Sequence, residues 1–347
     1  MDFGCARLAK KERRFMKEAL YYLPLKEKNK VQCFLCPHQC IVDDGKMGIC
    51  RTRKNEGGKL FALVYDQFTS VNLDPIEKKP LYHFYPGREI LSLGTVGCNL
   101  KCKGCQNYEI SQAEIGEIPT KTVTSDDAVR MAKEYDSIGI AYTYNEPLIN
   151  FEYLLETAHE AHKYNLKNVL VTNGYINEEP LMNLLPYIDA ANVDVKSFRN
   201  NFYNDYCKAK LGDVLRAVEI IARQKKHVEV TNLVIPTLND ADSEIEDLTD
   251  WLYSLSDEIP LHFSRYYPCY KMTIEATPLA TLERVRKIAQ KKLKYVYLGN
   301  VWEKPESNTY CPSCKEVLIE RRGYRTRVVG LAGENCRNCG EKINIKV

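Results

Sequence analysis

The stretch GCNLKCKGCQN, residues 97 to 107, places Cys98, Cys102 and Cys105 on one short loop with the spacing C-x3-C-x2-C. Closed structural zinc sites and most cubane iron–sulfur clusters take four protein ligands. Three thiolates can instead hold three corners of a [4Fe–4S] cube and leave the fourth iron open, as catalytic metals require. The triplet therefore predicts a catalytic cluster whose missing ligand is supplied by a cofactor.

The remaining cysteines are also clustered, and the chain has 14 in all. Without an export signal, C-x2-C spacings indicate metal binding in a reducing cytoplasm rather than disulfides, so we expect a cytoplasmic protein. Isolated thiols, buried or at the surface, are expected at Cys5, Cys207 and Cys269.

The last part of the chain carries the spacing C-x2-C-x21-C-x2-C, formed by Cys311, Cys314, Cys336 and Cys339. Two such knuckles around a hairpin predict a zinc ribbon, with a rubredoxin-type iron site as the alternative.

Near the start of the chain the spacing is C-x2-C-x3-C-x9-C, formed by Cys33, Cys36, Cys40 and Cys50. This spacing is compatible with structural zinc, with an auxiliary [4Fe–4S] cluster, or with no metal. His38 lies inside the loop and is a candidate replacement for one cysteine.

Cysteine position divides the chain into three predicted parts. Residues 1–60 hold an N-terminal helix, predicted from apolar residues at helical spacing between Leu8 and Leu23, followed by the first cysteine knuckle. Residues 61–300 hold the catalytic core, and residues 301–347 hold the ribbon-like tail.

The middle part alternates short apolar runs with amphipathic stretches. Strands are expected at EILSLGTV, IGIAYTY, NVLVT, DAANVDV, HVEVTNLVI, IPLHFSR and YVYLG. Helices fill the gaps, one of them beginning at the candidate N-cap Ser125. This alternation predicts an α/β fold, a partial (β/α)6-type TIM barrel, with a doubly wound sheet as the alternative.

Polar residues follow or end most of the expected strands, where α/β barrels carry their chemistry. The strands lead in order into Cys98, Asn145 with Glu146, Asn173, Asp194 with Lys196, Glu229 with Thr231 and Asn232, and His262 with Ser264 and Arg265. Six such ends in register predict one cleft.

Composition excludes two other classes of protein. A net charge of +3 is too small for the basic footprint of a nucleic-acid binder, and no apolar run approaches the length of a membrane span.

CNLKCKGC resembles the signature of the radical SAM superfamily. The resemblance implies a [4Fe–4S] cluster that binds S-adenosylmethionine (SAM) and cleaves it reductively to a 5′-deoxyadenosyl radical, which abstracts hydrogen from a substrate. It also implies an electron donor such as a flavodoxin or ferredoxin.

GCNLKCKGCQN with YNEP and DVK looks like the branch that contains pyruvate formate-lyase activating enzyme. By that resemblance Asn145 and Glu146 hold the SAM amino group, and Asp194 and Lys196 contact SAM near its carboxylate. The further cofactor contacts expected from position are Gly104, Gln106, Asn173 and Arg265.

The sequence departs from this branch at two points. Gly104 stands where an aromatic residue commonly packs near the adenine, which makes Tyr108 the candidate substitute. The eight-cysteine insertion of many glycyl-radical activases is absent after Cys105.

A longer likeness, which includes CFLCPHQC, LDPIEKKPLYHFYPG, VTNGY, VIPTLND and PLHFSRYYP, resembles the AmmeMemoRadiSam system radical SAM enzymes. It implies Memo-like and AMMECR-like partners but no substrate. The leading hypothesis is a radical SAM enzyme, of oxidoreductase or activase type, acting on a small molecule or a protein. The alternatives are a glycyl-radical-enzyme activase and a non-catalytic multi-zinc scaffold that binds RNA or protein.

Overall fold

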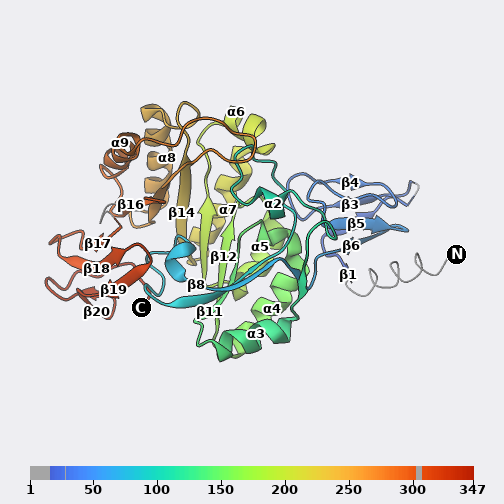
Figure 1. Ribbon diagram of the computed structural model, residues 1–347, viewed down its shortest axis with the longest axis horizontal. Coiled ribbons are helices and arrows are strands. Elements are labelled where there is room, and N and C mark those ends of the chain that lie inside the picture. The colour runs from blue at the N-terminus through green and yellow to red at the C-terminus, as the bar shows by residue number, and fades with distance from the viewer. Residues whose placement is uncertain (1–15, 28, 302–306) are drawn as a thin grey trace.

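The computed structural model describes residues 16–27, 29–301 and 307–347. A central parallel sheet carries helices on its outer side, a small β module precedes it, and a cysteine-rich β module follows it (Figure 1). The two small modules lie at opposite ends of the long axis of the molecule, so the central sheet separates the first cysteine group from the last.

The central sheet has eight strands in the order β16-β15-β14-β13-β12-β11-β9-β8. Only β8 is antiparallel to its neighbour, and β9 to β16 pair in parallel, each with the next strand of the sheet in the chain. Chain order without reversal is that of a singly wound barrel, so the partial barrel is confirmed and the doubly wound alternative is wrong. The bounds are β8 Ser70–Pro75, β9 Glu89–Gly94, β11 Gly139–Tyr142, β12 Lys167–Thr172, β13 Ala190–Asp194, β14 His227–Val234, β15 Leu261–Arg265 and β16 Val296–Gly299.

The connecting helices pack amphipathic faces against the sheet. In α7, the buried residues include Leu211, Val214, Val218 and Ile221, which recur at helical spacing. The helices are α2 Tyr108–Ser111, α3 Ser125–Glu134, α4 Phe151–Lys163, α5 Glu178–Leu184, α6 Asn200–Phe202, α7 Leu211–Arg223, α8 Asp242–Leu255 and α9 Leu279–Ala289. Among the residues that the structure describes, none of these helices combines the length and apolar character needed to cross a bilayer.

The start of α3 differs by one residue from the sequence expectation. Thr124, not Ser125, is the N-cap, and it forms a capping box in which its side chain accepts from the backbone of Asp127. Asp127 returns the contact to the Thr124 backbone, which explains why the cap lies one residue earlier.

The N-terminal module is built from strands, and the expected helix is wrong over its described part. Residues 1–15 lie outside the described residues, but residues 17–24 hold two strands that pair antiparallel with β6 and β3. The buried Arg53 guanidinium donates to the Leu20 carbonyl and so fixes the extended chain. Strand pairing thus overrides the helical spacing of the apolar residues. The module comprises β1 Lys17–Glu18, β2 Tyr22–Pro24, β3 Val31–Cys33, β4 Ile41–Val42, β5 Arg53–Glu56 and β6 Lys59–Ala62. The remaining short pair joins β7 Gln67–Phe68 to β10 Lys121–Thr122.

The C-terminal module shares a core with the barrel. Its strands are β17 Thr309–Tyr310, β18 Val317–Arg322, β19 Arg325–Val328, β20 Leu331–Ala332 and β21 Asn335–Cys336. Leu318 and Ile319 pack in one cluster with Tyr295 and Tyr297, which lie beside and within β16. The boundary at residue 301 therefore stays a prediction, because apolar packing continues across it.

A buried polar network centred on Glu229 lies inside the barrel. The Glu229 carboxylate accepts from the backbone of Tyr82 and His83 at 3.0 and 2.7 Å, and from Nε2 of His227 and His262 at 3.0 and 2.6 Å. Glu229 and His262 were expected among the strand-end residues of the cleft. Each lies two residues before Thr231 or Ser264 on its strand, on the same face and further from the cleft. Residues 82 and 83, which lie between β8 and β9 in the chain, cover them there.

Hydrogen bonds set the protonation state of this carboxylate. Burial alone would raise the pKa of Glu229, but the hydrogen bonds from His227 and His262 hold it well below its ordinary value. Glu229 is therefore ionised in the folded chain, and the stability it contributes is present above its unfolded pKa of about 4.3 and is lost as pH falls below that value.

We expect Glu229→Gln to lower the free energy of unfolding near neutral pH by about 3 kcal/mol, because two imidazoles and two backbone donors lose a buried anion. Urea denaturation of the metal-loaded chain measures the change. The difference from wild type should shrink as pH falls below about 4, since wild-type Glu229 then protonates.

The matched control is Glu246→Gln on the exposed side of α8, which should change stability by no more than about 0.5 kcal/mol. Equal effects of the two substitutions, or a difference that grows on acidification, would contradict the role given to Glu229.

Candidate active site at the mouth of the barrel

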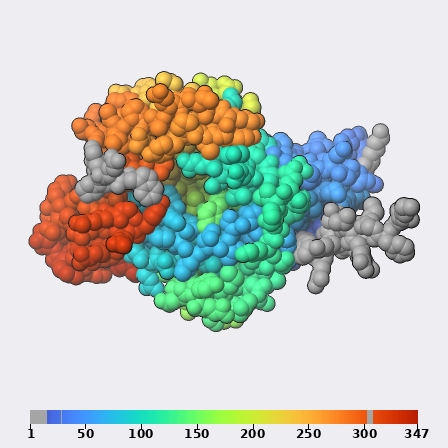
Figure 2. All heavy atoms as spheres, in the orientation of Figure 1, coloured from blue at the N-terminus to red at the C-terminus, as the bar shows by residue number. Residues whose placement is uncertain are grey.

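A cleft of about 870 Å³ opens at the carboxyl ends of the parallel strands. Figure 2 shows a hollow at the centre of one face, with barrel segments at its floor. The cleft lining includes most of the predicted cofactor and cluster residues, namely Cys98, Cys102, Gly104, Cys105, Gln106, Asn145, Glu146, Asn173, Asp194 and Lys196. The predicted convergence of strand-end residues in one cleft is thus observed for these side chains.

The loop that carries the three cysteines is held by Asn145. Its Oδ1 accepts from the Thr95 backbone at 3.1 Å, and its Nδ2 donates to the Gly97 carbonyl at 2.8 Å. Both ends of this amide are therefore used by the protein, so Asn145 fixes where the loop leaves β9. A contact of Asn145 with SAM stays a prediction.

Gly97 lies where the cysteine loop meets the N-terminal module. Its φ is +85°, and an added Cβ would lie 2.5 Å from Cγ2 of Thr52 and 2.7 Å from the Cys50 carbonyl oxygen. Only glycine combines that backbone conformation with so close an approach. The contact between Gly97 and the segment from Cys50 to Thr52 consequently fixes the position of Cys98, the first cysteine of the triplet.

Each sulfur of the triplet lies near a polar neighbour. Cys98 Sγ accepts from the Leu100 backbone at 3.3 Å and lies 3.7 Å from the Asn173 amide nitrogen. Cys105 Sγ lies 3.1 Å from the Ser111 hydroxyl. Hydrogen bonds of this kind stabilise thiolates and tune the potential of a bound cluster.

The sulfur of Cys102 has a partner that the sequence did not indicate. A hydrogen bond with the Cys207 thiol lowers the pKa of Cys102. Cys207 and Cys269 were both expected to be isolated thiols. Cys269 instead donates to the Cys105 carbonyl at 3.5 Å. Both residues are far from the triplet in sequence, so spacing gave no signal for either contact.

Glu146 is buried at the end of the loop after β11. Its carboxylate accepts from the Thr172 hydroxyl at 2.6 Å and from the backbone of Asn173 and Leu148 at 2.7 and 3.1 Å. Burial raises the pKa of Glu146 to about 7 despite these donors. A carboxyl with a raised pKa in an open cleft is suited to pairing with a cationic ligand group, which would restore its charge.

Asp194, the last residue of β13, and Lys196 form an ion pair of 2.8 Å. Burial opposes the charge of Lys196, but Asp194, Cys102 and Cys207 outweigh it and raise its pKa well above the ordinary value. Lys196 is therefore a permanent cation at the cleft, and Asp194 is its fixed counter-charge.

The space beside Gly104 is filled by an aromatic residue from another element. An added Cβ on Gly104 would lie 2.5 Å from the Tyr206 hydroxyl, which accepts from the Gly104 backbone at 3.0 Å. Tyr206 belongs to the π-helical turn Tyr203–Cys207 and stacks on Phe202 with ring centroids 4.6 Å apart. Both rings line the cleft. Tyr108, the expected substitute, instead stacks on Tyr270 and does not line the cleft.

The structure does not bring Arg265 into the cleft lining. Its Nε donates to the Thr277 carbonyl at 2.8 Å, and its guanidinium lies over the Tyr267 ring. Ser264, its neighbour on β15, lines the cleft instead. Because side chains alternate along a strand, only one of these two neighbours can face the barrel interior.

One group of cleft residues lacked an assigned role in the sequence. Asp74 binds Lys79 at 2.8 Å and accepts from the Tyr144 hydroxyl, and all three line the cleft. Burial opposes the charge of Asp74, but Lys79 and Tyr144 hold its pKa well below the ordinary value. These residues come from the antiparallel edge strand, its following turn and the loop after β11, which only the fold brings together.

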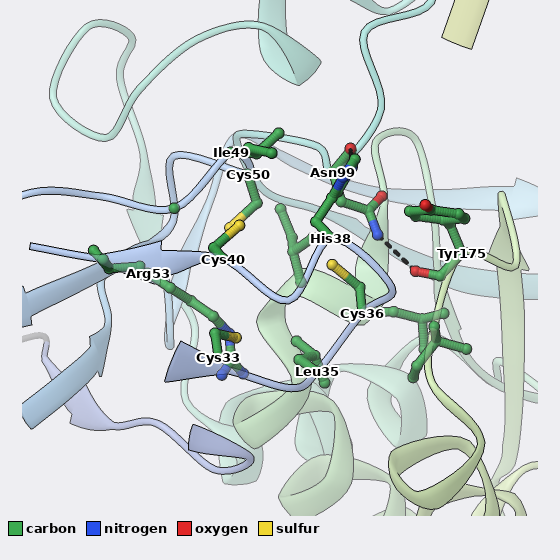
Figure 3. A pocket seen from close by; sticks show the side chains of 15 residues that line it. Cys33, Leu35, Cys36, His38, Cys40, Ile49, Cys50, Arg53, Asn99 and Tyr175 are labelled. Atoms are coloured by element: carbon green, nitrogen blue, oxygen red, sulfur yellow. Dashed lines mark hydrogen bonds between the residues drawn. The ribbon is translucent and has the colours of Figure 1, made fainter. Parts of the chain in front are cut away.

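The other two cysteine groups lie outside this cleft. The sulfurs of Cys311, Cys314, Cys336 and Cys339 all lie within 4.8 Å of one another, a spacing that suits a single tetrahedral ion. The sulfurs of Cys33, Cys36, Cys40 and Cys50 surround a separate small cavity in the N-terminal module (Figure 3).

The residues of the cleft fit an open iron–sulfur cluster. Three cysteines from one loop line it with hydrogen-bonding neighbours, and no fourth cysteine of the described residues joins them in that lining. The buried Glu146 and the cation Lys196 lie on the same lining, so a zwitterionic ligand can be held beside the metal.

The chain is similar to a known family model and to several known proteins. A model of the Radical SAM superfamily matches residues 92–252. An uncharacterized protein of Methanocaldococcus jannaschii is 44% identical over 338 residues, which cover 95% of this chain and 99% of that protein. The (2S)-3-sulfopropanediol dehydratase activating enzyme of Klebsiella oxytoca is 23% identical over 33% of this chain and 36% of that enzyme.

Among solved structures, a radical SAM methyltransferase from Sphaerobacter thermophilus aligns with a TM-score of 0.48 and 15% identity. The alignment covers 86% of this chain and 82% of that one.

The contact at Gly97 yields a direct test of how the cysteine loop is placed. In Gly97→Ala, the positive φ should cost about 1 to 2 kcal/mol, and the clash with Thr52 and Cys50 about 1 to 3 kcal/mol more. We expect lower iron content after anaerobic reconstitution and a lower urea midpoint.

The matched control is Gly116→Ala. Gly116 has a φ of +94° but nothing within 4 Å of an added Cβ, so this variant carries the backbone strain without the clash. The same iron content in both variants would contradict a role of this contact in placing Cys98.

Proposed function

We propose that the cleft of this chain, an enzyme of the radical SAM superfamily, binds a [4Fe–4S] cluster and SAM in order to abstract hydrogen from a substrate. The observation that carries the proposal is the meeting of the cysteine triplet with Glu146, Asp194 and Lys196 on one lining. A scaffold that only binds RNA or protein needs no such groups around three cysteines, so we set that alternative aside.

Cys98, Cys102 and Cys105 would hold the cluster and leave one iron for SAM. When both are bound, they supply the reductive cleavage of SAM to methionine and a 5′-deoxyadenosyl radical. The protein contributes the fixed loop, the hydrogen bonds to the sulfurs and a barrel interior that shields the reacting atoms from water.

Glu146 and Lys196 suit the two charged ends of the SAM amino acid. The Glu146 carboxylate accepts three hydrogen bonds from the protein and retains capacity for an ammonium group. Lys196 suits the carboxylate, with Asp194 holding the lysine side chain in place. Asn173 connects Glu146 to the cysteine loop, because its backbone donates to Glu146 and its side chain binds Asn99 beside Cys98.

Tyr206 and Phe202 are the proposed adenine contacts. They occupy the side of the cleft next to Gly104, where the radical SAM likeness leads us to expect an aromatic ring. An aromatic face binds a purine base by stacking whichever element supplies it.

The residues that resemble the AmmeMemoRadiSam system enzymes support a narrower identity, with Memo-like and AMMECR-like proteins as partners and a flavodoxin or ferredoxin as electron donor. The substrate is then a small molecule or a residue of a partner protein. Activation of a glycyl-radical enzyme is the second candidate, supported by relatives named as activating enzymes in Klebsiella oxytoca and Clostridioides difficile.

The proposal is tested by measuring 5′-deoxyadenosine formed from SAM by anaerobically reconstituted, reduced protein. Wild type should produce it and Cys102→Ala should not, because a cluster held by two cysteines is not retained. The control is Cys269→Ala, which removes a nearby cysteine outside the triplet and should keep activity. Activity in Cys102→Ala equal to that of wild type would overturn the assignment of the cluster.

The aromatic assignment predicts opposite results for two tyrosines. Tyr206→Leu should raise the Kd for SAM roughly tenfold, equivalent to about 1.4 kcal/mol of lost stacking. Tyr108→Leu should leave the Kd unchanged, and Tyr206→Phe, which keeps the ring, should stay close to wild type. Isothermal titration of the reconstituted protein measures all three, and weaker binding in the Tyr108 variant alone would favour Tyr108 as the contact.

A further inference from the structure

The three cysteine groups of this chain differ in how far apart their sulfurs lie. Within the described residues, the C-terminal four meet the spacing of one ion, with all sulfurs within 4.8 Å of one another. Neither the N-terminal four nor the cleft triplet meets it, although all seven of those cysteines are described. The N-terminal group and the triplet therefore both differ from the ribbon in the spacing of their sulfurs.

The distance between ligating sulfurs depends on whether they bind one ion or a cluster. Zn–S bonds of about 2.3 Å in a tetrahedron place sulfurs about 3.8 Å apart. The C-terminal pairs match, with Cys311 and Cys339 sulfurs 3.6 Å apart and those of Cys314 and Cys336 3.7 Å apart. Cysteines that ligate different irons of a cube are separated by roughly 6 Å, because the cube lies between them. Wider spacing therefore suits a cluster better than one ion.

A side chain that lines the N-terminal cavity carries a buried donor without a hydrogen-bond partner. Arg53 lines the cavity with a side chain that is 2% exposed, and its charge acts on Cys33 and Cys50. Its two terminal nitrogens bind Glu152 and the Leu20 carbonyl, but Nε is buried with no hydrogen-bond partner. Orphaned donors of this kind are costly in a folded protein, so Nε is available to an acceptor that binds in the cavity.

The rest of the lining suits an inorganic cluster. Apolar side chains enclose the cavity, among them Leu35, Val42, Leu148 and Ile176, and the Thr52 hydroxyl donates to Cys50 Sγ at 3.2 Å. His38 also lines the cavity, and its Nε2 lies 2.7 Å from the Asn99 carbonyl, which leaves only Nδ1 free. The four cysteines are by themselves a complete ligand set for a cube.

The cavity adjoins the cysteine loop of the cleft. The Cys50 carbonyl and Thr52 lie against Gly97, and His38 reaches the carbonyl of Asn99, so contacts from the N-terminal group fall on both sides of Cys98. A group bound in the cavity is therefore placed next to the catalytic loop.

We propose that Cys33, Cys36, Cys40 and Cys50 bind a second, fully ligated [4Fe–4S] cluster beside the cysteine loop of the cleft, with Arg53 donating to it. This site does not depend on the proposed function of the cleft, because its ligands, donor and lining all belong to the N-terminal module and the barrel segments that cover it.

The test removes the catalytic triplet from the full chain. After anaerobic reconstitution with iron and sulfide, Cys98→Ala/Cys102→Ala/Cys105→Ala should retain about four iron and four sulfide per chain, and wild type about eight of each. A [4Fe–4S] Mössbauer or EPR signature should persist in this variant. The C-terminal site serves as an internal reference, since it should hold one ion and no sulfide in both proteins.

A variant with about two zinc ions and no sulfide would overturn the proposal in favour of structural zinc, and a variant with only the C-terminal ion would show that the N-terminal group binds no metal. Adding Cys36→Ala to the triplet variant should abolish the remaining sulfide. Circular dichroism verifies its folding, and if it fails to fold, wild-type sulfide near eight rather than near four still decides the question. In wild type, about eight sulfide per chain without any SAM cleavage would count against the proposed function of the cleft alone.

Discussion

The structure depends on holding three thiolates close together at the mouth of a barrel. Sulfurs that share a cluster carry like charge, so the loop needs its backbone fixed and its sulfurs supplied with donors before any metal enters. Asn145 fixes the start of the loop, the segment from Cys50 to Thr52 packs against Gly97, and Asn173 binds Asn99. The N-terminal module is therefore part of the proposed cluster site, because one wall of the loop is made from it.

The two ends of the barrel differ in whether their buried carboxylates are paired. At the carboxyl ends of the strands, polar groups face an open cleft, and burial raises the pKa of Glu146, with which no cation among the described residues pairs. At the other end, Glu229 is fully paired by two histidines and two backbone donors, and segment 82–83 covers it. The paired end contributes stability, whereas the unpaired end is available to a ligand.

The sequence predicted the parts of this fold that follow from local pattern. The seven expected strands and their order follow from apolar runs alternating with amphipathic helices, and strand ends placed Glu146, Asp194 and Lys196 together. Depth inside the barrel was not predictable, because residues two apart share a face, and so Glu229 was grouped with Thr231. The N-terminal helix was wrong over residues 17–24, since strand partners from β3 and β6 lie outside any local window.

Gly104 and Tyr206 show why a site residue can be absent from a motif and still be present in the site. The Tyr206 hydroxyl would lie 2.5 Å from a Cβ at position 104, so a side chain there and this placement of Tyr206 exclude each other. Tyr206 follows β13, as Lys196 does, and the backbone of Lys196 donates to the nearby Tyr203 hydroxyl. One segment after β13 thus carries both the cleft cation and the ring. In the proposed SAM site, a longer-range contact therefore takes the place of the aromatic residue missing from the cysteine motif, and spacing alone cannot reveal it.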